Sequence, residues 1–276
     1  MKTFYLFIMM LVAFPSFLYG QTWWKLENIH ADFGGGFGGD PGFSWTDLEN
    51  QSYSASFPDY RASDLRPYYG LIDIRLSGVA RASVTAGLYP YSKKRGDYNG
   101  RKEWKTGIFY EYQALPGPKY TNSRRYSTYQ DTTSYLYLNF NERRQYLGIT
   151  NSITFRTNPE SRLNLFGGAG LDFGWSIAGK INAFDSKNIS VRSDLGTYVT
   201  TLNVDQNTHY RTYSSFLGSL HLFYGLGIRF LHHFYLSYSG GFDIQYIDYF
   251  HASNGGNLFL FEKFDLSIPL EGRKEF

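Results

Sequence analysis

Alternation of apolar and polar residues is the feature that most constrains the fold of this chain. Between residues 233 and 250 the even positions are mostly large and apolar, whereas the odd positions are mostly small or polar. Segments 161–178 and 213–230 repeat this pattern over similar lengths. A period of two places every second side chain on the same face of a β-strand. The sequence therefore predicts long strands, each with one apolar and one polar face.

The composition indicates what these two faces contact. Aromatic residues make up 20% of the chain, yet the mean hydropathy is only −0.37. After residue 20, no apolar run approaches the roughly 18 residues that a membrane helix needs. The polar faces are rich in Gly and Ser and carry few charges, as suits a narrow barrel lumen. We predict an all-β fold, a closed antiparallel up-and-down transmembrane β-barrel.

The number of strands follows from counting the alternating segments. Ten is even, as single-chain bacterial barrels require, and it places both termini in the periplasm. However, residues 115–132 would then form a long periplasmic turn. An eight-strand barrel, in which 91–144 form one extracellular segment, is therefore kept as the alternative. The ten candidate strands are 29–38, 68–77, 80–90, 104–114, 133–140, 145–156, 161–178, 213–230, 233–249 and 258–270.

With ten strands, the connections divide between the two sides of the membrane. Short turns at Gly78-Val79, at 157–161 and at Leu231-His232 fall on the periplasmic side. The longer connections fall on the outer side; they are 39–67, 91–103, 179–212 and 250–257.

The first 20 residues contain one lysine followed by an apolar run and then smaller residues, which is typical of a secretory signal peptide. We expect cleavage after Gly20 and a single barrel domain over residues 21–276, exported to the outer membrane. The absence of cysteine excludes disulfides and thiolate metal sites. A formal net charge of +3 does not favour nucleic acid as a partner, and no cofactor is predicted.

A glycine-rich stretch, DFGGGFGGDPG at 32–42, matches the spacing G-x-G-x-x-G at Gly34, Gly36 and Gly39. A dinucleotide-binding fingerprint needs a helix directly after the glycine turn. Here two prolines and no helical apolar stripe follow, so the stretch is not a nucleotide site. We predict a strand whose inward positions are glycine because a small barrel leaves little lumen volume.

Residues 143–181, RRQYLGITNSITFRTNPESRLNLFGGAGLDFGWSIAGKI, combine a tyrosine-leucine strand, a turn and a glycine-rich strand. This stretch resembles the small outer-membrane β-barrel proteins of Bacteroidetes, the PorT-like group, and the resemblance extends over about 65–276. It implies an outer-membrane barrel surrounded by lipid and lipopolysaccharide, with a role in a secretion assembly. The last strand and its final Phe276 resemble the signal that hands such barrels to their assembly machinery.

A polar group on three successive strands is a candidate site. Ser, His and Asp side chains on the polar faces allow two interpretations, a hydrolytic constellation or a lumen network whose members satisfy one another. We favour the network, because a lipid substrate cannot reach an inward site. The residues are Asp172, Ser219, His221 and Asp243.

Three further sets of residues carry charge or could bind metal. Arg156, Arg162 and Arg229 are expected to point inward near the periplasmic end, where they form a basic constriction opposite few acids or fill the lumen. A basic outer loop could contact lipopolysaccharide phosphates or remain solvated; its residues are Lys93, Lys94, Arg95, Arg101 and Lys102. No metal site is predicted from His232, His233 and His251, because adjacent strand residues point to opposite faces.

These observations predict a structural, adhesive or assembly-associated membrane protein without a catalytic centre. A narrow pore for small solutes is the alternative. A lipid-modifying barrel enzyme is the third class, and it would need an outward-facing polar cluster at the bilayer edge.

Overall fold

The computed structural model describes eleven stretches of the chain. They are residues 22–39, 66–67, 76–92, 97–98, 101–126, 132–157, 161–192, 198–211, 214–230, 234–249 and 255–270. The proposed signal peptide, Lys93, Lys94, Arg95 and the three histidines considered for metal binding lie outside the described residues. Within the described ranges, no helix has the length and apolar character needed to cross a bilayer.

All described secondary structure is β. Three strands are much longer than the others, and their length shapes the molecule. The strands are β1 (Thr22–Gly39), β2 (Arg66–Pro67), β3 (Leu76–Ser92), β4 (Asp97–Tyr98), β5 (Lys102–Tyr126), β6 (Thr132–Arg156), β7 (Leu163–Arg192), β8 (Tyr198–Arg211), β9 (Ser215–Phe230), β10 (Phe234–Tyr249) and β11 (Gly255–Pro269).

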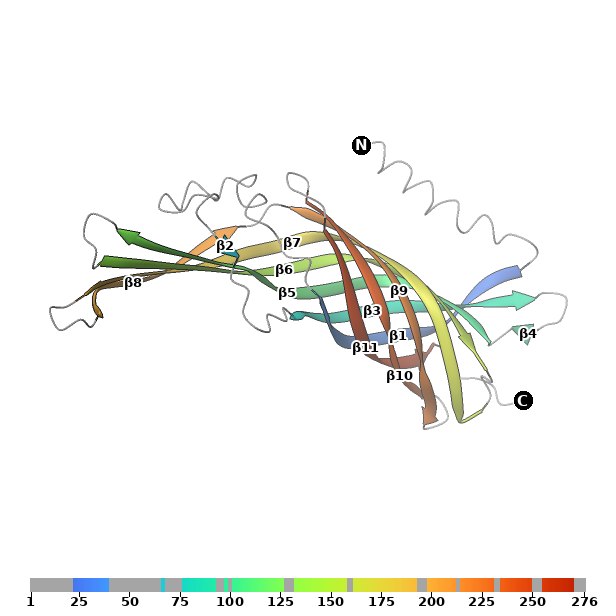
Figure 1. Cartoon of the computed structure of the whole chain (residues 1–276). Helices are drawn as coiled ribbons and strands as arrows, with labels where there is room; N and C mark the ends of the chain where they lie inside the picture. Colours follow the sequence, from blue (N-terminus) through green and yellow to red (C-terminus); the bar gives the residue numbers. More distant parts are fainter. Residues whose placement is uncertain are drawn as a thin grey trace.

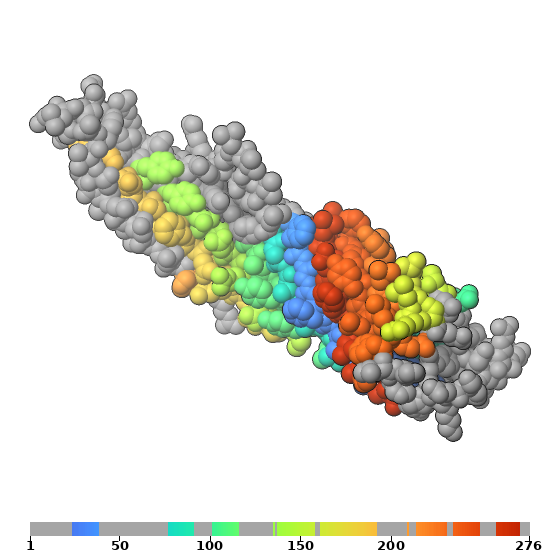
Figure 2. All heavy atoms as spheres, turned by 90° about the horizontal axis from the view of Figure 1, so that it is seen from below, coloured from blue at the N-terminus to red at the C-terminus, as the bar shows by residue number. Residues whose placement is uncertain are grey.

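Eight of these strands form a closed ring in the order β1-β3-β5-β6-β7-β9-β10-β11, and every pair is antiparallel. The pairing of β1 with β11, for example Phe33 with Phe264, joins the first strand to the last. In Figure 2 the blue β1 accordingly lies against the red β11. The predicted closed up-and-down barrel is confirmed, and its strands number eight, as in the alternative count. The expectation that 91–144 is one outer excursion is wrong, because β5 is a strand of the ring and pairs with β3 from Leu88–Trp104 to Gly78–Ala114.

The ten-strand count is wrong for two reasons. Segments 133–140 and 145–156 are one continuous strand, β6, that pairs with β5 and β7 along its length. The candidate strand 68–77 lies mostly outside the described residues, and its last two residues belong to β3. The stretch assigned to an outer connection, 179–212, instead contains the rest of β7 and the whole of β8.

The eight-strand ring reverses the assignment of some connections. Asn28 near the start of β1 pairs with Pro269 at the end of β11, so the first strand begins and the last strand ends at the same end of the ring, which we call the terminal end. Thr22 pairs with Ser92, so connection 91–103 lies at the terminal end too, not with the outer connections. Gly78-Val79 is not a turn but lies within β3 near the opposite end.

The ring exposes apolar side chains outward and buries polar ones inward. On β10, Leu236, Phe242 and Ile244 are 45–52% exposed, whereas Ser237 and Asp243 are 6% or less exposed. An apolar exterior around a polar interior is the arrangement of a barrel that crosses a bilayer. The alternation in the sequence therefore arises because one face of each strand contacts lipid and the other faces the lumen.

Inward glycines make room for large side chains from neighbouring strands. A Cβ on Gly36 would lie 2.5 Å from the Leu260 carbonyl oxygen and 3.2 Å from Cδ2 of Phe261, so only glycine fits beneath that ring. A Cβ on Gly148 would clash with the Phe173 carbonyl oxygen and lie 2.7 Å from Cε1 of Phe109. The glycine-rich stretch of β1 is therefore part of the barrel wall.

Strands β5, β6 and β7 continue past the ring and, with β8 and the short β2, form a sheet that we call the extension (Figure 1). The last β3–β5 pair is Gly78 with Ala114, and the last β7–β9 pair is Trp175 with Phe216. Beyond these positions β5 pairs with β6 and the short β2, and β7 pairs with β6 and β8. The extension leaves the ring at the end opposite the terminal end.

Candidate functional site

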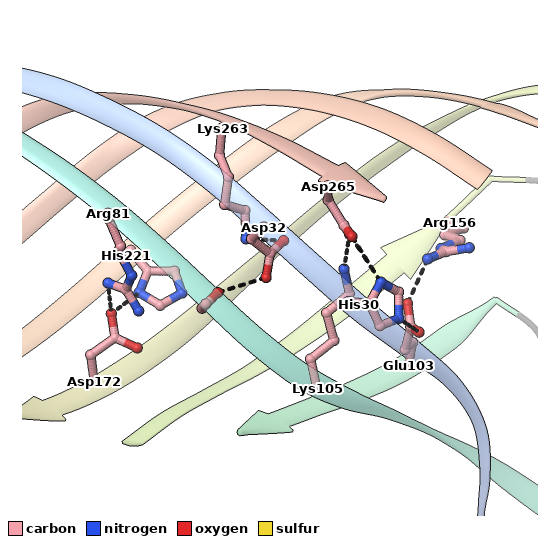
Figure 3. Close-up of polar contacts among 11 residues, drawn as sticks. His30, Asp32, Arg81, Glu103, Lys105, Arg156, Asp172, His221, Lys263 and Asp265 are labelled. Carbon is pink, nitrogen blue, oxygen red and sulfur yellow. Dashed lines mark hydrogen bonds and ion pairs between the residues drawn. The ribbon is translucent and has the colours of Figure 1, made fainter. Parts of the chain in front are cut away.

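The lumen near the terminal end holds an ionic network, which we call the lower network, from β1, β5, β6 and β11 (Figure 3). Both ring nitrogens of His30 face carboxylates, with Nε2 2.7 Å from Glu103 and Nδ1 3.0 Å from Asp265. Lys105 donates to Asp265, and Arg156 donates to Glu103 at 2.5 Å. Strand alternation alone brings these five side chains to one side of the wall, where each charge meets an opposite one.

A second ionic group, the upper network, lies farther from the terminal end (Figure 3). Arg81 on β3 pairs with Asp172 on β7 and approaches Glu111 on β5 at 3.7 Å. His221 on β9 places Nδ1 3.2 Å from Asp172, and its ring lies where a side chain on Gly170 would otherwise be. Arg81 is thus the cation that compensates the two buried carboxylates.

The structure places the four predicted polar residues in the lumen but in two separate contacts. Ser219 donates to Asp243, which also accepts from Gln245 at 2.9 Å. His221 instead faces Asp172. A hydrolytic serine needs its hydroxyl hydrogen-bonded to a histidine base, and the hydroxyl of Ser219 is directed to a carboxylate. The geometry fits a lumen network of ion pairs and hydrogen bonds.

The three arginines expected to form a basic constriction differ in environment. Arg156 is inward, but it is paired with Glu103 and stacked over Tyr235, with its guanidinium carbon 4.7 Å from the ring centroid. Arg162 is exposed just before β7, and its carbonyl accepts a hydrogen bond from the backbone of Arg229. The expectation that few acids oppose this set is wrong for Arg156, because Glu103 neutralises it.

Above the upper network, apolar side chains fill the ring. Phe109, Tyr146, Leu217 and Ile247 form a cluster in which each residue is at most 1% exposed. Arg81 lies 4.2 Å from the centre of the Phe109 ring, so the cluster rests directly on the upper network. We call this cluster the plug.

Between the two networks remains a cavity of about 40 Å³. Its walls include Asp32, Ser83 and Lys263, and Asp32 accepts from Ser83 at 2.8 Å and lies 3.2 Å from Lys263. A water molecule needs about 10–15 Å³ of such space. The cavity can therefore hold a few waters but not a typical organic ligand, whose pockets are roughly 300 Å³ or more.

Two residues of the predicted basic outer loop lie within the described ranges. Arg101 and Lys102 are exposed at the start of β5, at the terminal end of the ring. Within the described ranges, no group of three or more His, Asp or Glu residues could hold a metal ion.

One charged residue faces outward where alternation predicts lipid. Glu262 on β11 is exposed between apolar neighbours, and the Tyr238 hydroxyl hydrogen-bonds its carboxylate. Its cross-strand partners are Gly35 and Gly240, whose missing side chains leave space on both sides. The alternation alone predicts that Glu262 faces outward, but this residue is not among the sites predicted from the sequence.

Comparison with known proteins finds only distant likenesses. No family model and no curated protein matches this chain. Among solved structures, neisserial surface protein A aligns over 89% of this chain and 98% of its own, at 11% identity and a TM-score of 0.33. Ail, the attachment invasion locus protein of Yersinia pestis, aligns over 87% of this chain and 99% of its own (12%, TM-score 0.24). The CymD monoaromatic hydrocarbon channel aligns over 90% of each chain (6%, TM-score 0.23). At such scores the alignments carry no argument about fold or function.

Proposed function

We propose that this chain is an integral outer-membrane protein whose ring anchors the extension at the cell surface. There the extension acts as a binding surface in adhesion or in a surface or secretion assembly, without a catalytic centre. The observation that carries this proposal is the continuous pairing of β5, β6 and β7 from the ring into the extension. Because these three strands run unbroken from the ring into the extension, they hold the extension above the membrane.

The orientation follows from the connections. Outer-membrane barrels have short periplasmic turns and longer extracellular loops. The connections at the terminal end are 93–101, 157–162 and 231–233, and all are far shorter than connection 40–75, which lies at the other end together with the extension. We therefore place the terminal end in the periplasm and the extension outside. The resemblance to PorT-like barrels supports the assembly-associated form of this role, with a cleaved signal peptide and insertion by the barrel assembly machinery.

Two side chains test the orientation, because the chain has no cysteine to interfere. Tyr135 is exposed in the extension, and Arg162 is exposed at the terminal end. A membrane-impermeant maleimide added to intact cells should label a Tyr135→Cys variant. An Arg162→Cys variant should react only after the outer membrane is permeabilised. Labelling of Arg162→Cys alone in intact cells would contradict the orientation.

The binding role is tested by trimming the extension. Pro116 pairs with Asn141, and Asn182 pairs with His209, so a short turn can join each pair and remove 117–140 and 183–208. Cells that display the trimmed chain should lose attachment to one another and to surfaces. A mobility shift on boiling would show that the trimmed ring is folded. Unchanged attachment with a folded ring would refute the role of the extension.

A narrow pore is the second candidate, favoured by the cavity between the two networks. The plug and the paired charges oppose it, because a conducting path must displace both. We expect purified protein to give no discrete conductance steps in planar bilayers. For the enzyme class, a Ser219→Ala/His221→Ala variant should match the wild type in ester hydrolysis.

A further inference from the structure

Two cations lie side by side on the outer surface where the ring meets the extension. Arg143 on β6 is the cross-strand partner of Lys180 on β7, and both are exposed. Lys180 is in turn the register partner of Arg211 on β8. We call Arg143 and Lys180 the cationic pair.

The pair is unfavourable by itself. Directly opposed side chains on one face of a sheet lie about 5 Å apart, and like charges there repel. In the part of the chain that the structure describes, no carboxylate lies within ion-pair distance of Arg143 or Lys180. The neighbouring acid, Glu142, is buried on the other face and paired with Arg144. A bound anion would offset the repulsion.

The location of the pair identifies the kind of anion. Along the outer face of β7, apolar side chains end with Trp175 and Ile177, and Lys180 follows. Along β6 the exposed Leu147 is followed, toward the extension, by Arg143. A change from apolar and aromatic to charged side chains marks the edge of the bilayer. The cationic pair therefore lies at the height of lipid headgroup phosphates.

The next cross-strand row of the same face supplies further polar groups. Asn141 pairs with Asn182, which pairs with His209, and His209 Nδ1 lies 2.8 Å from Asn182 Oδ1. Amide and imidazole groups can hydrogen-bond the sugar or phosphate of a headgroup. The two rows together form a polar strip above the apolar band.

We propose that Arg143 and Lys180 bind the phosphates of a phosphorylated glycolipid in the outer leaflet, the lipid A part of lipopolysaccharide. Arginine forms bidentate hydrogen bonds with a phosphate, and lysine adds a second positive charge. The proposal rests on the outer-membrane orientation proposed above. It places lipid recognition at this edge, and not in the basic connection 91–103 at the terminal end.

The test uses the full chain, purified in detergent, with fluorescent diphosphoryl lipid A as the probe. Arg143→Ala and Lys180→Ala should each weaken lipid A binding about tenfold, because losing one hydrogen bond to a charged group lowers the affinity by about that factor. Arg162→Ala is the matched control, an exposed arginine at the terminal end, and it should bind as the wild type does. Fully dephosphorylated lipid A should bind wild type and double variant equally weakly.

Three results would overturn the proposal. They are unchanged lipid A affinity in a folded Arg143→Ala/Lys180→Ala variant, equal wild-type affinity for dephosphorylated lipid A, and competition by inorganic phosphate at the concentration at which lipid A binds. The last would indicate a site for a free phosphate ion. The boiling-dependent mobility shift reports folding, and the maleimide labelling reports orientation. Failure of those two experiments would instead refute the proposed function.

Discussion

The ring and the extension share three strands, but beyond the plug residue Tyr146 the ring part of β6 buries polar side chains, whereas the extension part buries apolar ones. In the ring, β6 buries Thr150 and Thr154 and exposes Leu147 and Phe155. In the extension, the inward face of β6 carries Leu138 and Phe140, which are buried at 0% exposure. The outward face carries Arg143 and Asn141, which are exposed.

The reversal is explained by the change of solvent. Lipid contacts the outer face of the ring, whereas water contacts the outer face of the extension. The period of two continues through the boundary, but the face that carries apolar residues changes.

This reversal explains what could be predicted from the sequence and what could not. Alternation in the lipid-facing segments was sufficient for the barrel, because apolar residues there keep one parity. In β6 the apolar residues change from odd positions (Leu147, Phe155) to even positions (Leu138, Phe140), and the charged residues 142–144 lie between them. A change of parity beside a charged run was interpreted as a turn. The structure instead pairs Arg144 with Glu142 inside the wall.

The remaining part of β7 and the whole of β8 were missed for a related reason. The register between β6 and β7 shifts at one point, where Gln145 pairs with Ala178 but the next residue, Tyr146, pairs with Ser176. The parity of the outward positions of β7 therefore also changes beyond Ile177. The lumen residues were easier to predict individually, because position on the polar face identifies them. Their pairing was not predictable, since the partners of Arg81 and His30 come from strands distant in sequence.

The largest expected effect comes from overfilling the ring. Gly148→Ala places a methyl group against the Phe173 carbonyl and Phe109, and a backbone atom cannot move aside in a closed ring. We expect a loss of about 3 kcal/mol or more in the free energy of unfolding, seen as loss of the boiling-dependent mobility shift. Gly78→Ala is the control, because a Cβ there meets nothing within 4 Å. Equal behaviour of the two variants would disprove the tight inner packing.

A smaller loss should follow from breaking the upper network. Arg81→Met leaves Asp172 and Glu111 without their cation, and breaking a buried ion pair costs about 3 kcal/mol. Denaturant unfolding in detergent measures the loss. Adding Asp172→Asn to the same chain should recover part of it, and full additivity of the two losses would show that the residues do not interact.

In the extension, a substitution should act locally. Leu138→Asp puts a carboxylate at a fully buried position opposite Asp185. We expect it to lower the free energy of unfolding of the extension by about 2 kcal/mol. Protease cleavage on intact cells should increase. The boiling-dependent shift of the ring should remain, because the ring residues are untouched. Loss of that shift would mean that ring and extension fold as one unit.

The smallest effect, and the only stabilising one, is expected at the outer face. Glu262→Leu replaces an exposed carboxylate in the lipid-facing band, and charged residues there cost up to about 2–4 kcal/mol, less for carboxylates. We expect the free energy of unfolding in lipid bilayers to rise by about 1 kcal/mol. A decrease would indicate that Glu262 and Tyr238 contribute a stabilising contact that the apolar residue cannot replace.

Amide contacts measured by NMR on the protein in detergent micelles or nanodiscs would decide whether the ring continues into the extension. We expect cross-strand contacts between Val84 and Ile108 in the ring, and between Leu136 and both Asn122 and Lys187 in the extension. Amides of β6 should be protected from exchange on both sides of Arg143. A hairpin contact between segments 133–140 and 145–156, or unprotected amides throughout 132–141, would contradict the eight-strand ring with a continuous extension.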